Sequence, residues 1–338
     1  MGSLAMHAQA AQVPLPQQQR AVVQDGTGGP QVLKLERIAV LQPAAGQVLI
    51  KVHAAAVNPA DWGGLVRPAA PGSTVRRVPG LDVSGVIVAV GAGVTDRSVG
   101  MPVFAIVGPV QAGLNGAFAQ YVIAKAAITA PKPAQISYAQ AAGLGVVGVT
   151  ALRALDEAQV RAGQRVLITG VAGGVGSTAA QIAFARGATV LGTASPRHDA
   201  YLRSIGVSKV IDYRQGDVAG HAGKVDVVVD TVGGEEAIDA FHALKAGGQF
   251  VSIARAQVTP QQCAAAQVHC SGSPGHAADA PLAALLQIAR LAGAGTLTLH
   301  VDRTYPLSEA AEALQYVHAG HTEGKVVLTA TAAAPRGR

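Results

Sequence analysis

Aromatic and charged residues are both scarce in this sequence. Of its 338 residues, only 4% are aromatic and 14% are charged, against roughly 25% charged residues in a typical globular domain. Hydrophobic residues make up 49%, so the chain can bury a large core of small aliphatic side chains, and global disorder is excluded. At roughly 100–200 residues per domain, the length predicts two domains.

Cysteines, long apolar runs and basic clusters are also nearly absent. The two cysteines, Cys263 and Cys270, cannot form a disulfide framework, which favours a reducing cytoplasm. The most apolar stretches, 78–94 and 139–155, are interrupted by Gly, Asp or Arg and are shorter than the ~20 residues of a membrane span, so no membrane association is expected. The net charge is +6, but the basic residues are scattered, which indicates a generally basic enzyme surface and no nucleic-acid partner. Such a surface would also assist the binding of an anionic cofactor.

The pattern of the chain changes along its length. Residues 1–19 show no periodicity and predict a disordered leader. Short strands separated by Pro and Gly follow as far as residue 136. From 137 to 301, short apolar strands alternate with helices, which predicts an α/β fold with a doubly wound parallel sheet. Residues 302–338 differ again, with a helix expected from Tyr305 and a closing strand at 324–328.

A glycine-rich turn is the strongest motif in the chain. Gly170, Gly173 and Gly176 follow a predicted strand and precede a predicted helix. Glycines let the backbone approach a pyrophosphate, and a helix N-terminus supplies N–H donors and a favourable dipole. We therefore predict a dinucleotide site in which the phosphate-binding residues are Ala172, Gly173, Gly174, Val175 and Gly176.

The end of the next predicted strand, 189–192, indicates the type of dinucleotide. NAD sites usually place an acidic residue there for the ribose hydroxyls. This chain instead has Ser195 and Arg197 and no acid between 193 and 197. Because a guanidinium and a hydroxyl suit a 2′-phosphate, the pattern predicts NADP(H). The alternative is a Ser-Pro turn followed by a solvated arginine.

Several further motifs occur in a recognisable order between about residues 20 and 328. They are Val57-Asn58-Pro59-Ala60-Asp61-Trp62, Pro79-Gly80-Leu81-Asp82-Val83-Ser84-Gly85, Gly116-Ala117-Phe118-Ala119-Gln120-Tyr121-Val122, Gly148-Val149-Thr150-Ala151, the glycine turn and Gly324-Lys325-Val326-Val327-Leu328. Together they resemble the medium-chain dehydrogenase/reductase superfamily, in particular its zinc-free, quinone oxidoreductase-like (zeta-crystallin-type) branch. The resemblance implies a GroES-like β-barrel catalytic domain from residues 20–136 and 302–338, and a Rossmann NADP-binding domain from 137–301. It also implies a homodimer formed through the edge strand of the Rossmann sheet, which would be 297–301 here.

The resemblance also assigns roles to individual residues. It implies that Asn58 lies beside the nicotinamide ribose and the substrate, and that Thr150 contacts the nicotinamide end of the cofactor. Asn58 could instead be only a turn residue before Pro59, and Lys325 only a surface charge. The remaining cofactor-binding candidates are Tyr213 and Lys325, by resemblance, and Thr231, Val232, Ser252 and Ile253, which end later strands.

No metal site is expected. Zinc-dependent relatives carry ligands where Asn58, Leu81 and Val146 stand, and none of these three is a usual zinc ligand. Without a Lewis acid, nothing stabilises the alkoxide that oxidation of an alcohol requires. Reduction of an electron-poor acceptor needs only hydrogen-bond donors and a proton.

The predicted activity is therefore NADPH-dependent, zinc-independent hydride transfer to a small molecule, either a quinone or the activated C=C bond of an α,β-unsaturated carbonyl compound. One alternative is a reductase of short-chain enoyl thioesters, although residues 62–67 lack the tyrosine that thioester-reducing relatives carry. An alternative of another class is a non-catalytic, crystallin-like NADPH-binding protein.

Overall fold

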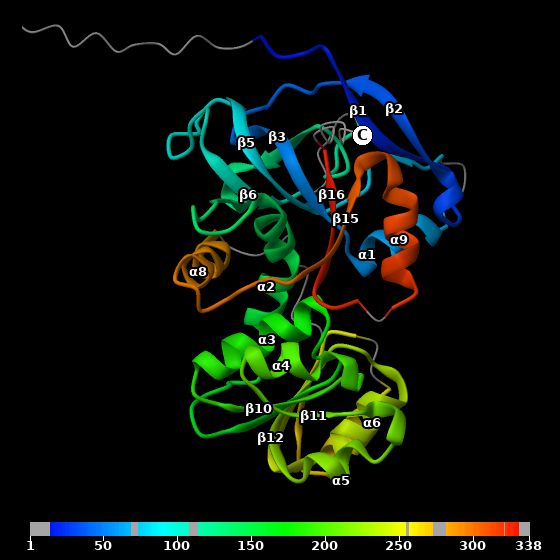
Figure 1. Cartoon of the computed structure of the whole chain (residues 1–338), viewed down its shortest axis with the longest axis vertical. Helices are drawn as coiled ribbons and strands as arrows, with labels where there is room; N and C mark the ends of the chain where they lie inside the picture. The colour runs from blue at the N-terminus through cyan, green and yellow to red at the C-terminus, as the bar shows by residue number, and fades with distance from the viewer. Residues whose placement is uncertain are drawn as a thin grey trace, which may run out of the picture.

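The computed structural model describes residues 14–68, 74–107, 114–254, 257–272, 282–320 and 322–330. Figure 1 shows two bodies stacked along the long axis of the molecule. The blue, cyan and red segments, from the two ends of the chain, form the upper body, and the green and yellow middle segment forms the lower one.

The larger sheet of the upper body joins the two ends of the chain. Its strand order is β15-β16-β3-β5-β6-β8, and β7 also pairs with β3. The pairing of β16 with β3 is antiparallel and places Val327 opposite Ala56, so N-terminal and C-terminal residues build one sheet. The bounds are β3 Gln47–Ala56, β5 Asp82–Val90, β6 Pro102–Ile106, β7 Tyr121–Lys125, β8 Thr129–Pro131, β15 Val301–Pro306 and β16 Lys325–Thr329.

A three-stranded sheet and two helices complete the upper body. The strands are β1 (Gln18–Asp25), β2 (Leu33–Ala39) and β4 (Arg76–Arg77), and the helices are α1 (Pro59–Val66) and α9 (Ala310–His318). Because β1 begins at Gln18, the last two residues of the predicted leader belong to a strand. The helix expected from Tyr305 begins at Ala310 instead, because Tyr305 still pairs with Leu328 in the sheet.

The lower body is a six-stranded sheet in the order β11-β10-β9-β12-β13-β14, and every pairing in it is parallel. Val227 and Val229 pack into the core on one face of the sheet, and Val228 packs into the core on the other. A strand buried on both faces requires this continuous apolar run, as predicted. The strands are β9 Arg165–Ile168, β10 Thr189–Thr193, β11 Val207–Ile211, β12 Val225–Asp230, β13 Leu244–Ser252 and β14 His269–Ser271.

Helices cover both faces of this sheet, so the predicted doubly wound architecture is confirmed (Figure 1). One core contains residues of α2, α3 and α8, and the other contains residues of α5, α6 and α7. The helices are α2 Tyr138–Glu157, α3 Gly174–Ala185, α4 Asp199–Ser204, α5 Val218–Ala222, α6 Gly234–His242, α7 Pro260–Ala265 and α8 Leu282–Gly293.

Helix α2 connects the two bodies, because it packs on β3 and β5 above and on α3 and α8 beside it (Figure 1). It starts with a capping box in which Ser137 Oγ accepts a hydrogen bond from Gln140 N at 3.1 Å. Within the described ranges it is the one helix long and apolar enough to cross a membrane, yet 67% of its most apolar window is buried. That burial is typical of a core helix.

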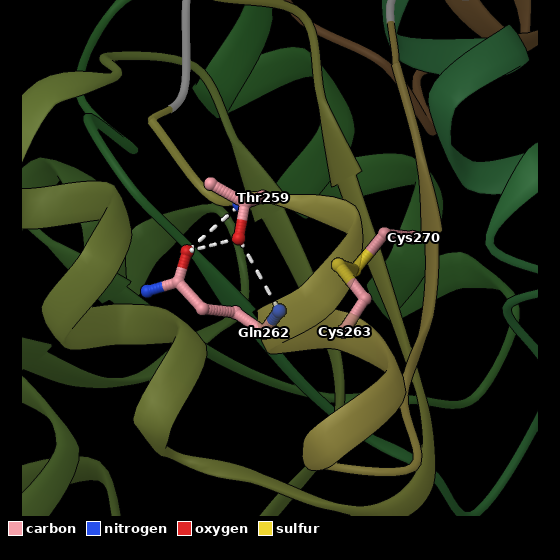
Figure 2. Close-up of a disulfide and its surroundings, with 4 residues drawn as sticks. All are labelled: Thr259, Gln262, Cys263 and Cys270. Atoms are coloured by element: carbon pink, nitrogen blue, oxygen red, sulfur yellow. Dashed lines mark hydrogen bonds between the residues drawn. A yellow bond between two sulfur atoms is a disulfide. The ribbon is translucent and has the colours of Figure 1, made fainter.

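The two cysteines form a single disulfide, which the sequence did not predict. Figure 2 shows Cys263, on α7, bonded to Cys270, on β14, with an S–S distance of 2.09 Å. Beside it, Thr259 caps α7 by accepting a hydrogen bond from Gln262 N. The bond therefore links a covering helix to the edge strand of the lower sheet, although a framework of several disulfides is excluded as expected.

The edges of the lower sheet differ from the expected dimerisation strand. In the described chain its edge strands are β11 and β14. Residues 297–300 lie in no strand, and Val301 begins β15 of the upper sheet. The prediction that 297–301 forms an edge strand of the Rossmann sheet was therefore wrong, because the chain has already crossed to the upper body there.

Candidate active site

A cavity of about 730 Å³ lies between the two bodies. Its walls come from the turn before α1, from α2, from the glycine turn, from the ends of β10, β12 and β13, and from β16. The residues predicted from sequence that line it are Asn58, Thr150, Ala172, Gly173, Gly174, Val175, Gly176, Ser195, Tyr213, Thr231, Val232, Ile253 and Lys325. Arg197 and Ser252 are not among its lining residues.

The glycine turn has the geometry that a pyrophosphate requires. Gly173 is the N-cap of α3 and offers no side-chain cap, so no side chain of the cap competes for the first-turn N–H groups. A Cβ on Gly176 would lie 2.5 Å from Gly170 O, so only glycine fits there. The turn therefore fits the phosphates of a dinucleotide, with the helix dipole adding to the attraction.

The C-terminal strand docks directly on this turn. Gly324 N donates a hydrogen bond to Ala172 O at 2.8 Å. The next residue, Lys325, runs past the first turn of α3, where a Cβ on Gly174 would lie 2.7 Å from Lys325 Cδ. Gly324 and Lys325 thus carry a lysine across the glycine turn and into the wall of the cavity.

Lys325 begins a buried hydrogen-bonded chain. Its Nζ donates to Val57 O and to Asn58 Oδ1, each at 2.6 Å. Asn58 Nδ2 then donates to Asp82 Oδ2 at 3.0 Å, and Asp82 Oδ1 accepts from Val146 N at 2.8 Å. The third N–H of the ammonium has no acceptor among the described residues, and Lys325 lines the cavity.

Two carboxyl groups compensate the charge of Lys325. Burial raises the pKa of Asp82 to about 6 and that of Asp61 to about 7, and the charge of Lys325 opposes both shifts. Asp61 Oδ2 also accepts from Asn58 N at 2.8 Å, which fixes the start of α1. Burial lowers the pKa of Lys325, while Asp82 and Asp61 act in the other direction. The two carboxyl groups therefore favour the charged form of Lys325 against the effect of burial.

Helix packing makes room for Asp82. A Cβ on Gly145 of α2 would collide with Asp82 Oδ1, so this helix can approach the carboxylate only through a glycine. Val146, Val147 and Thr150 of the same helix line the cavity. The helix therefore both donates a backbone N–H to Asp82 and lines the site.

A glutamate, Glu236, lies beside the end of β10 in another part of the cavity wall. Thr193 Oγ1 accepts from Gly170 N at 2.9 Å and donates to the carboxylate of Glu236 on α6. Burial raises the pKa of Glu236, and the hydrogen bond from Thr193 opposes that shift. Glu236 lines the cavity together with Ser195 and Tyr213.

Arg197 lies beside this region and contacts a second acid through a histidine. Arg197 Nε donates to His198 Nε2 at 3.0 Å, and His198 Nδ1 lies 2.5 Å from Glu323 Oε2. His198 lines the cavity, whereas Arg197 does not. Ser252, the other predicted residue outside the lining, donates to Asp230 Oδ2 at 2.6 Å behind the wall.

Comparisons with known proteins agree with this arrangement. Residues 44–134 match the alcohol dehydrogenase GroES-like domain, and residues 205–328 match the zinc-binding dehydrogenase model. The chain is 35% identical to the NADPH-dependent alkenal/one oxidoreductase, chloroplastic, of Arabidopsis thaliana, and the match covers 94% of this chain and 81% of that protein. It is 32% identical to the quinone oxidoreductase of Rattus norvegicus, over 89% of this chain and 94% of that protein.

A solved structure, the quinone oxidoreductase from Coxiella burnetii, superposes with a TM-score of 0.82 at 31% identity and covers 92% of this chain and 99% of that one. The chain belongs to the medium-chain dehydrogenase/reductase superfamily, in its quinone oxidoreductase-like branch. The resemblance predicted from the motifs is thus confirmed. This dehydrogenase/reductase is an oxidoreductase that uses a nicotinamide cofactor.

The residues of this superfamily member do not form a zinc site in the cavity. Asn58 offers an amide that Lys325 and Asp82 already hold, and Leu81 and Val146 have no donor side chain. Across the part of the chain that the structure describes, no three His, Cys, Asp or Glu side chains are grouped to hold a metal ion. The basic group at this wall is the side chain of Lys325.

Sequence reasoning missed three groups of the site. Asp82 stood in a motif that carried the family resemblance, but its role depends on the contact with Asn58. Glu236 comes from α6, far along the chain from the strand end where an acid was sought. Glu323 directly precedes the closing glycine and is visible only through its contact with His198. None has a local sequence signal, because each acts through tertiary contacts.

Proposed function

We propose that the protein is an NADPH-dependent reductase that transfers hydride to a quinone or to the activated C=C bond of an α,β-unsaturated carbonyl compound. The observation that carries the proposal is the Lys325 ammonium, which is held at the cavity wall with one N–H uncommitted among the described residues. The names of the Arabidopsis and rat relatives support the same substrate classes.

The reaction requires that negative charge be stabilised on the acceptor oxygen. A nicotinamide cofactor held by the glycine turn would supply the hydride for the β-carbon of the alkene, and negative charge would then develop on the carbonyl oxygen. The uncommitted N–H of Lys325 can donate to that oxygen as the charge develops, and a preorganised donor of this kind costs little reorganisation. Burial lowers the pKa of Lys325, which is the direction that favours transfer of a proton from Nζ to the enolate oxygen.

Asn58 acts on this scheme as a positioning residue. Its amide oxygen accepts from Lys325 and its amide nitrogen donates to Asp82, so the amide fixes where the ammonium stands. Thr150 lines the same end of the cavity and is proposed to contact the nicotinamide. The proposal therefore gives the contact with the substrate oxygen to Lys325, and Asn58, which the resemblance places beside the nicotinamide ribose and the substrate, acts through Lys325.

The choice of NADPH over NADH is part of the proposal. Ser195 lines the cavity just beyond β10, and Arg197 stands two residues later, beside His198. A hydroxyl and a guanidinium suit a 2′-phosphate. The Arabidopsis relative is named as NADPH-dependent, which supports the same choice.

A substrate panel tests the function. NADPH oxidation is followed with a quinone, a simple enone, a short enoyl thioester and no acceptor, and NADP⁺ reduction is followed with a saturated alcohol. We expect turnover with the quinone or the enone and negligible turnover with the alcohol. Turnover of the thioester alone would establish the enoyl-thioester alternative. Binding of NADPH without turnover of any acceptor would establish the crystallin-like alternative.

We also propose that the protein is a cytoplasmic homodimer, that residues up to 136 and from 302 form the catalytic domain, and that 137–301 form the NADP-binding domain. The separate upper and lower sheets support this division, with β1 extending the first domain to Gln18. Light scattering tests the dimer, and a mass equal to that of one chain would exclude it.

A further inference from the structure

The adenosine end of the cavity contains an acid that opposes the arginine. In a doubly wound sheet, the group that selects between ribose hydroxyls and a 2′-phosphate stands at the end of the second strand of the nucleotide-binding unit. Here that strand is β10, and the segment after it carries no acid. An acid from another element reaches this strand end. Glu236, in the first turn of α6, accepts a hydrogen bond from Thr193, the last residue of β10.

The hydroxyl group of Thr193 fixes the position of Glu236. The Thr193 hydroxyl donates to it, and the same hydroxyl accepts from the N–H of Gly170, the first glycine of the phosphate-binding turn. The loop before α6 covers that glycine, since a Cβ on Gly170 would meet Thr231 Oγ1 and Val232 Cγ2. Glu236 is half-buried and lines the cavity. A carboxylate is therefore held between the phosphate-binding turn and the strand end where adenosine selectivity is decided.

We propose that Glu236 is a specificity-determining residue for the cofactor, whose carboxylate accepts a hydrogen bond from an adenosine-ribose hydroxyl and repels a 2′-phosphate. This inference rests on the proposed binding of a nicotinamide dinucleotide. Ser195 and Arg197 favour the phosphorylated cofactor, and Glu236, which contacts Thr193 at the end of the same strand, opposes them. The preference of the protein for NADPH is thus a balance between two sets of side chains and is smaller than Arg197 alone would give.

The decisive variant is Glu236→Gln, which keeps an oxygen to accept the Thr193 hydrogen bond but removes the charge. The matched control is Glu235→Gln, because Glu235 is the neighbouring acid on the same turn but is exposed and does not line the cavity. Binding of NADPH and NADH is measured by calorimetry, together with two fragments that carry only the adenosine end, adenosine 2′,5′-bisphosphate and AMP. Thermal melting reports on folding.

We expect Glu236→Gln to raise the ratio of the NADH Kd to the NADPH Kd by about tenfold or more, the range for one hydrogen bond to a charged group. The ratio for AMP and adenosine 2′,5′-bisphosphate should move in the same direction, and Glu235→Gln should leave both ratios unchanged. Glu236→Ala serves as a second variant and should shift the ratios with the same sign, even if it melts earlier.

The outcomes separate the two proposals. If neither Glu236→Gln nor Glu236→Ala changes the ratio of the NADH Kd to the NADPH Kd, Glu236 only supports Thr193 and this inference is overturned. The same holds if Glu236→Gln weakens the binding of all four ligands equally. If the unmodified protein binds neither dinucleotide, the proposed function fails and the inference fails with it. If the protein reduces quinones but the ratio of the NADH Kd to the NADPH Kd is unchanged in the Glu236 variants, this inference fails and the proposed function stands.

Discussion

Replacement of Lys325 by methionine tests the proposed chemistry most directly. The side chain is 4% exposed, and its Nζ donates to Val57 O and Asn58 Oδ1 at 2.6 Å each. Lys325→Met keeps the length of the stem that passes Gly174 while removing the charge and all three donors. The backbone pairing of β16 on the turn and on β3 does not involve this side chain.

The magnitude follows from the contacts that are lost. Removal of one preorganised donor to a developing oxyanion lowers kcat by roughly 10²–10³-fold, so kcat/KM for an enone should fall by about two to three decades. The affinity for NADPH should change by less than about tenfold, because the phosphate-binding N–H groups of the turn remain in place. The pKa of Asp82, about 6 in the unmodified protein, should rise further, because the charge of Lys325 is the largest of the influences that lower it.

Stopped-flow measurement of a single turnover separates the chemical step from cofactor binding, and NADPH titration gives the Kd. The control is Lys209→Met, because Lys209 is exposed, donates to His221 O at 2.7 Å and does not line the cavity. The control should leave both constants unchanged. If Lys325→Met retains nearly full kcat/KM, or loses cofactor affinity as strongly as it loses turnover, then Lys325 is not the donor at the reacting end.

Three further predictions use other parts of the site. Arg197→Glu should weaken NADPH binding by about one to two decades with little effect on NADH, and equal loss for both cofactors in a titration would contradict the 2′-phosphate assignment. Chelators should leave activity and Tm unchanged, whereas one zinc per chain by elemental analysis would show that the ligand argument is wrong. The pKa of Asp61 is raised from 3.8 to about 7 in the folded state, so the folded state binds this proton more tightly and the carboxyl costs stability as the pH rises from about 4 to about 7. Asp61→Asn should therefore gain stability relative to the unmodified protein across that window, by up to roughly 4 kcal/mol, and a difference in Tm that does not vary with pH would refute the raised pKa.

Local pattern predicted the lower body well, because its strands are buried on both faces. Val227, Val228 and Val229 alternate between two cores, so the strand appears as an uninterrupted apolar run. The glycine turn was equally clear, since only glycine fits at Gly176. The upper body was harder to predict, because the partner of β3 is β16, the last strand of the described chain, far from β3 in sequence. That pairing was reached through family resemblance and not through periodicity.

The predicted helix start at Tyr305 illustrates the limit of local signals. The run of Leu307, Ser308 and Glu309 does form a helical turn, but Tyr305 and Pro306 before it still pair with Leu328 and Thr329. A strand end and a helix start follow one another there without a break. The pairing partner lies beyond the helix in sequence, so nothing local reveals that the strand continues.

The nature of the charge at the reacting end of the cavity bears on the direction of the reaction. A metal ion stabilises an alkoxide strongly and generates it at neutral pH, which alcohol oxidation requires. An ammonium group instead donates a hydrogen bond to an oxygen that becomes negative during reduction, and it can then give up a proton. Lys325 is tied to Asn58, and through it to Asp82, so its position is set before substrate arrives. A wall built in this way favours reduction of an electron-poor acceptor over oxidation of an alcohol.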